Sequence, residues 1–124
     1  VTFICYRLHI LILGVNMGVY YYLVCPAHRE YMFVAKTPNP FLPEFYEFLR
    51  RLGDRVRWGM CKDSVWRLSR DQLEELVKIC PHVKIFVEKH GSCKVYLGED
   101  TIYDVFDVFN IDHTWREIES ENEK

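Results

Sequence analysis

The sequence predicts a single α+β domain, with an antiparallel sheet built from hairpins and two or three helices packed on one face. The chain has 124 residues, a length typical of one domain. Its composition is 49% hydrophobic and 27% charged, which is ordinary for a globular protein and excludes disorder and coiled coil. Paired β-rich segments alternate with segments of helical periodicity, which is typical of hairpins covered by helices.

The first predicted hairpin joins residues 18–25 to residues 30–36. Both segments are rich in β-branched and aromatic residues, and only four residues separate them. Residues 1–16 precede this hairpin. They are interpreted as an upstream extension, because Met17-Gly18 resembles a natural start, or as an extra strand, because their apolar residues alternate with a period of two. The domain itself is expected to span residues 17–116.

Two helices are predicted from apolar residues at helical spacing. The first covers residues 43–52 and begins at Pro43, which suits a first helical turn. The second begins at Ser69, where Gln72 completes a capping box, and ends before Pro81. The apolar residues of these two helices are Phe45, Phe48, Leu49, Leu52, Leu73, Leu76, Val77 and Cys80.

Short strands are predicted between and after these helices. Alternating residues predict a strand over residues 55–60, a turn at residues 62–64 and a return strand over residues 65–68. A second hairpin is expected to join residues 83–87 to residues 94–97.

The carboxyl-terminal part of the chain predicts one more helix and a tail. Asp100 or Thr101 would cap the helix, and its inward side chains would include Val105 and Phe109. Residues 117–124 are polar and mostly acidic, and they are interpreted as an acidic tail.

Charge is segregated along the chain although the formal net charge is only −2. Residues 50–70 carry seven basic side chains against two acidic ones, whereas residues 95–124 are strongly acidic. Basic side chains with tryptophans between them suggest a surface for nucleic acid or another acidic partner, and the alternative is a solvated arginine face paired with the acidic third of the chain. The seven candidate binding residues are Arg50, Arg51, Arg55, Arg57, Lys62, Arg67 and Arg70.

Two short Cys/His pairs suggest a metal site. Cys25 and His28 have C-x2-H spacing in the predicted hairpin turn, and Cys80 and His82 have C-x-H spacing at a predicted helix end. If the two loops meet, these four residues could complete a tetrahedral Cys2His2 zinc site. Ordinary burial is favoured over a zinc site, because Cys80 falls on an apolar helix stripe.

Catalysis is predicted less strongly than binding. His90 and His113 could form a hydrolase- or nuclease-like site with Asp107 or Asp112. However, the sequence contains no nucleophile elbow, phosphate loop, HExxH motif or Rossmann glycine pattern. We therefore expect a non-enzymatic binding or interaction module, with a small metal-binding or hydrolytic enzyme as the alternative.

The remaining expectations concern compartment and assembly. Five cysteines at irregular spacings predict free thiols in a cytoplasmic protein and do not predict a disulfide framework. Successive aromatics at Tyr20, Tyr21 and Tyr22 place rings on both faces of a strand, which favours a homo-oligomer, with a dimer preferred. A purely structural homo-oligomer is the third alternative for the function, and a membrane span is not favoured.

Overall fold

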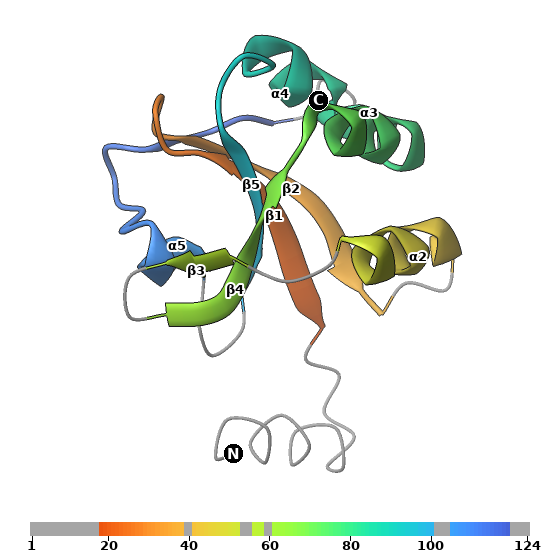
Figure 1. The fold of residues 1–124 in the computed structure, drawn as a ribbon. Coiled ribbons are helices and arrows are strands. Elements are labelled where there is room, and N and C mark those ends of the chain that lie inside the picture. Colours follow the sequence, from red (N-terminus) through yellow and green to blue (C-terminus); the bar gives the residue numbers. More distant parts are fainter. Residues whose placement is uncertain (1–17, 39–40, 53–55, 59–60, 101–104, 120–124) are drawn as a thin grey trace, which may run out of the picture.

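One mixed, mostly antiparallel sheet runs through the centre of the protein (Figure 1). The structure is a computed structural model, and it describes residues 18–38, 41–52, 56–58, 61–100 and 105–119. Within these residues six strands follow the order β3-β4-β5-β1-β2-β6. Their bounds are Val19–Cys25 for β1, Glu30–Thr37 for β2, Val56–Trp58 for β3, Cys61–Leu68 for β4, Val95–Glu99 for β5 and Arg116–Glu117 for β6. The predicted α+β class is confirmed.

The first predicted hairpin is formed by β1 and β2. The two strands pair antiparallel from Val19 opposite Thr37 to Cys25 opposite Glu30, with an irregularity after Tyr21. The four-residue turn between them has Arg29 in the left-handed region at φ 53°. The turn therefore holds its two flanking residues, Cys25 and Glu30, side by side at one end of the sheet.

Helices α2 (Pro43–Arg51), α3 (Arg70–Ile79) and α4 (Lys84–Lys89) pack on one face of the sheet (Figure 1). The predicted capping box of α3 is present, since Gln72 N–H donates to Ser69 Oγ and Ser69 N–H donates to Gln72 Oε1. The main core lies between these helices and the sheet. Its largest fully buried side chains include Phe45, Phe48, Phe86, Leu23, Met32, Leu76 and Leu97.

Two predicted elements were wrong. The strand expected at residues 83–87 is helical, with a 3₁₀ turn over Pro81–Val83 followed by α4. Val83 and Phe86 lie three residues apart and are both buried, so packing of this helical face overrides the β-propensity of the segment. The turn expected at residues 62–64 is absent because β4 runs without interruption from Cys61 to Leu68.

The predicted second hairpin is replaced by longer-range pairing. With residues 83–87 helical, β5 pairs antiparallel with β1 on one side and with β4 on the other. The short helix α5 (Val105–Val108) and Phe109 pack with Val24 and Tyr96 in a second buried cluster. In Figure 1 this helix lies on the other side of the sheet from α2, α3 and α4.

The last strand among the described residues was not predicted from the sequence. β6 pairs parallel with β2, and its Arg116 N–H donates to the Arg29 carbonyl at 2.9 Å. Glu117, taken as the start of the acidic tail, therefore belongs to the sheet. The interpretation of residues 1–16, and most of the tail, lies outside the described residues.

None of the helices in the described part of the chain combines the length and apolar character needed to cross a membrane.

Candidate metal centre

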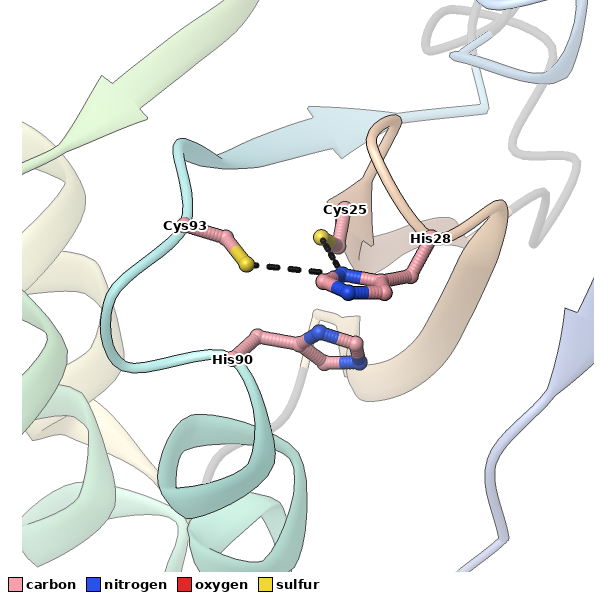
Figure 2. Close-up of side chains that lie close together, drawn as sticks. All are labelled: Cys25, His28, His90 and Cys93. Atoms are coloured by element: carbon pink, nitrogen blue, oxygen red, sulfur yellow. Dashed lines mark hydrogen bonds between the residues drawn. The ribbon is translucent and has the colours of Figure 1, made fainter.

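Two tight turns bring a Cys/His pair each to the same end of the sheet. The turn after β1 carries Cys25 and His28, and the turn between α4 and β5 carries His90 and Cys93. Their ligand atoms all lie within 4.8 Å of one another (Figure 2). Antiparallel pairing of β1 with β5 produces this meeting, since Val24 lies opposite Tyr96 and so places the end of β1 beside the start of β5.

Two distances between ligand atoms match those of a tetrahedral site. His28 Nδ1 lies 3.5 Å from Cys25 Sγ and 3.4 Å from Cys93 Sγ. With Zn–S about 2.3 Å and Zn–N about 2.05 Å, the sulfur and nitrogen ligands of a tetrahedral zinc ion are about 3.6 Å apart. His28 Nδ1 therefore lies at about the distance from both sulfur atoms that a shared zinc ion requires.

His90 is held in the orientation that a ligand requires. Its ring is fully buried, and Nε2 lies 2.7 Å from the carboxylate oxygen Oε1 of Glu30. The other nitrogen, Nδ1, is buried and has no hydrogen-bond partner among the described residues. A carboxylate on one ring nitrogen fixes the tautomer and presents the lone pair of the other nitrogen, as in carboxylate–histidine–metal arrangements.

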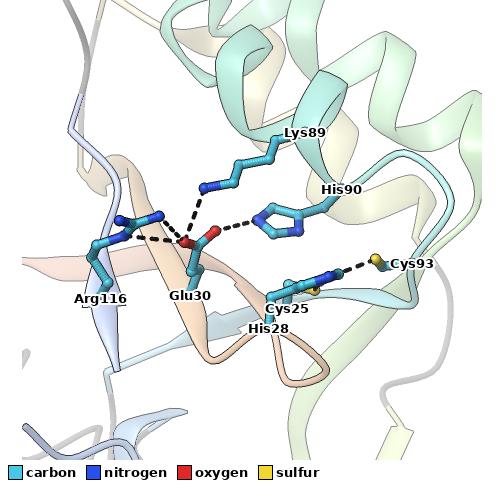
Figure 3. A network of polar contacts seen from close by, with 7 residues as sticks. All are labelled: Cys25, His28, Glu30, Lys89, His90, Cys93 and Arg116. Carbon is cyan, nitrogen blue, oxygen red and sulfur yellow. Dashed lines mark hydrogen bonds and ion pairs between the residues drawn. The ribbon is translucent and has the colours of Figure 1, made fainter. Parts of the chain in front are cut away.

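Glu30 is the centre of a wider polar network (Figure 3). Its second carboxylate oxygen, Oε2, accepts hydrogen bonds from Lys89 Nζ at 3.0 Å and Arg116 Nε at 3.1 Å. Burial by itself raises the pKa of Glu30, but hydrogen bonds from Lys89, Arg116 and His90 outweigh it and lower the pKa to about 2. The carboxylate is therefore ionised at neutral pH and acts as a permanent acceptor for His90.

The protonation states of the other groups follow from their surroundings. Burial lowers the pKa of His90 more than Glu30 raises it, so the ring is neutral at pH 7, the form that binds a metal. Burial raises the pKa of the Cys25 thiol. A metal ion would displace the thiol proton on binding, because the thiolate is the ligand.

The structure places the second predicted pair elsewhere. Cys80 is the C-cap residue of α3 and is 3% exposed, and burial raises its pKa to about 11. His82 lies on the 3₁₀ turn, where Nε2 is 3.1 Å from the Phe33 carbonyl oxygen. Neither residue belongs to the Cys/His group found among the described residues.

Sequence reasoning missed His90 and Cys93 as partners for the first pair. A local pattern was available, since His90-Gly91-Ser92-Cys93 has the H-x2-C spacing that mirrors Cys25-Pro26-Ala27-His28. The two pairs are distant in sequence, with 65 positions between His28 and Cys93. Only the pairing of β1 with β5 shows which two turns meet.

The structure does not support the predicted catalytic pairing of His90 with an aspartate. The carboxylate beside His90 is Glu30, and not Asp107 or Asp112. Asp112 accepts hydrogen bonds from the Thr114 side chain and backbone, which lower its pKa.

The structure describes the side chains of four of the seven predicted basic residues. Arg50 pairs with Glu47 at 3.0 Å, and Arg51 pairs with Glu75. Arg67 and Arg70 are exposed. The remaining three predicted residues cannot be placed on this surface, because Arg55 and the side chains of Arg57 and Lys62 lie outside the described residues.

Comparison with known family models, curated proteins and solved structures finds no match for this chain. The fold and the cluster together describe an α+β domain with a candidate Cys2His2 metal centre.

Proposed function

We propose that this protein is a non-enzymatic binding module whose fold is completed by one zinc ion, held by Cys25, His28, His90 and Cys93. The observation that carries the proposal is His90, a buried ring whose Nε2 is bonded to Glu30 and whose Nδ1 has no hydrogen-bond partner in the described part of the chain. An unpaired buried nitrogen is costly, and a metal ion would satisfy it.

The donor set favours zinc and a structural role. Two thiolates and two imidazoles in a tetrahedral arrangement are typical of zinc. Four protein ligands leave no open position for water or substrate, which catalytic zinc sites keep. The ion would join turns that are 65 positions apart in the chain, between His28 and Cys93, and so fasten α4 and β5 to the first hairpin.

The metal content of purified protein tests this proposal. We expect about one zinc per chain in wild-type protein prepared under reducing conditions, and loss of zinc in Cys93→Ser and in the double variant Cys25→Ser/His28→Ala. Cobalt substitution should give the intense visible absorption of a tetrahedral thiolate site in the wild type and not in these cluster variants.

Two variants of the other Cys/His pair supply matched controls. Cys80→Ala and His82→Ala change the same residue types outside the cluster and should keep a full complement of zinc. Loss of zinc from these variants with retention in Cys93→Ser would contradict the assignment.

The expected partner and location remain proposals of the same kind. We place the module in a reducing compartment, the cytoplasm, because zinc binding by Cys25 and Cys93 requires reduced cysteines, and neither they nor Cys80 form a disulfide among the described residues. Association into a dimer, and a nucleic acid or acidic protein as partner, were proposed from the sequence. Sedimentation velocity at two salt concentrations tests the dimer.

A further inference from the structure

A cavity of about 340 Å³ lies next to the candidate metal centre. Three segments form its walls: the end of β4, the first turn of α3 and the turn that precedes β5. Its volume is at the lower end of the range for small-molecule sites. The lining residues include Arg67, Arg70, Lys94 and the candidate metal ligand Cys93.

The charge of this cavity is its distinctive property. Arg67, Arg70 and Lys94 all line it and are exposed, and no acidic side chain lines it. None of the three makes an ion pair with another described residue, in contrast to Arg51 and Arg116, which pair with carboxylates. Three cations without an ion-pair partner among the described residues surround one hollow and repel one another, and an anion bound between them removes that repulsion.

The amino-terminal end of α3 adds a smaller favourable contribution. The positive end of the helix dipole lies at the cavity wall, because Ser69 and Arg70 both line the cavity. The capping box already satisfies the Gln72 N–H, so the helix end alone does not make a site. Asp71 lies in the same turn but does not line the cavity.

We infer that this cavity binds a phosphate group, held mainly by Arg67, Arg70 and Lys94. Guanidinium groups pair with phosphate through two parallel hydrogen bonds, and a lysine adds a compact charge. The group could be carried by a small phosphate ester or by a nucleic-acid backbone, which present the same oxygens.

The metal centre supports one wall of this cavity, and in this respect the inference rests on the proposed function. Cys93 is both a lining residue and a candidate ligand, and Gly91 and Lys94 flank the ligands on the same turn. A zinc ion with two thiolates and two neutral imidazoles has no net charge. It would therefore fix the turn without competing for the anion.

Titration of zinc-loaded protein with inorganic phosphate, followed by amide chemical shifts at constant ionic strength, tests the inference. We expect saturable shifts confined to residues 67–73 and 91–94. Arg70→Glu and Lys94→Glu should each weaken binding about tenfold or more, the effect of losing one charge-assisted hydrogen bond. Arg50→Glu is the matched control, because Arg50 is exposed but does not line the cavity, and it should bind as the wild type does.

The absence of saturable shifts in zinc-loaded wild-type protein would overturn the inference, as would equal weakening in Arg50→Glu. A phosphate monoester and a single-stranded oligonucleotide distinguish the two sources. Only the oligonucleotide should show an affinity that falls with salt at a log–log slope of roughly −0.7 per phosphate contact.

Zinc content measured on every sample separates this inference from the proposed function. Full zinc in Arg70→Glu with lost phosphate binding supports both. Full zinc in the wild type without phosphate binding rejects the phosphate site alone. Phosphate binding in a wild-type protein that takes up no zinc rejects the proposed function and retains the phosphate site.

Discussion

Replacing Glu30 by glutamine tests whether the polar network positions a metal ligand. The substitution keeps the size of the side chain but removes its charge. His90 Nε2–H, Lys89 and Arg116 are all hydrogen-bond donors. The NH2 group of the new amide is also a donor and must face at least one of them, so that hydrogen bond is lost. We therefore expect His90 to lose its fixed orientation, and zinc affinity to fall 10- to 100-fold, the usual cost of losing such a partner.

The zinc-free protein should also lose stability. The pKa of Glu30 is lowered from 4.5 to about 2, which corresponds to about 3 kcal/mol of stabilisation of the ionised form. Lys89 and Arg116 are 45% and 68% exposed, so solvent screening reduces the expected loss to about 1–2 kcal/mol. A lowered carboxyl pKa stabilises the fold above pH 4.5, and this contribution disappears as the pH falls toward 2. Glu30→Gln should therefore lack this part of the acid sensitivity.

Competition with a chromophoric chelator measures the zinc affinity, and urea unfolding of zinc-free protein measures the stability. Glu88→Gln is the matched control, because Glu88 lies on α4 in an exposed pair with Lys84 at 4.0 Å. Its zinc affinity should stay within about twofold of wild type, as expected for a surface pair. The reasoning is refuted if Glu30→Gln binds zinc as tightly as Glu88→Gln does.

Three further predictions address the metal, the thiols and the packing. The melting temperature should rise by about 5 °C for each tenfold increase in free zinc, because zinc that binds only the folded state stabilises it and a chain of 124 residues has a correspondingly moderate unfolding entropy. A melting temperature that does not change with zinc would argue against binding to the native state. Iodoacetamide at pH 8 should leave Cys80 unmodified in native protein, with or without zinc, because its side chain is 3% exposed and its raised pKa of about 11 leaves little thiolate. Peptide mass spectrometry measures the modification, and reaction of Cys80 as fast as Cys93 would contradict the prediction. Gly98→Ala should lower the free energy of unfolding in urea by about 1–3 kcal/mol, because an added Cβ would meet Val105 side-chain atoms at closer than van der Waals distance. A loss below about 0.5 kcal/mol would mean that α5 moves away freely.

Local patterns predicted the elements that depend on local contacts. The hairpin of β1 and β2 follows from two β-rich segments and a four-residue turn. Helix α3 follows from Ser69, Gln72 and the apolar stripe between them and Pro81. In each case the deciding interactions join residues within a few positions, so the sequence contains the information directly.

The elements that were mispredicted depend on distant contacts. The segment of α4 is rich in β-branched residues, but burial of Phe86 against the sheet selects a helix. Strand β6 contains only two residues, and it forms by pairing with the edge of β2 that β1 does not occupy. Neither choice can be read from residues close in sequence.

The candidate centre shows the same division. The sequence by itself determined the residue types, the C-x2-H spacing of Cys25 and His28, and the turn that holds them together. Only the tertiary structure decided that their partners are His90 and Cys93, and that Glu30 orients the His90 ring. The physical reason is that the partners meet through the pairing of β1 with β5, two strands separated by most of the chain, and strand pairing over such distances is set by the packing of the whole sheet.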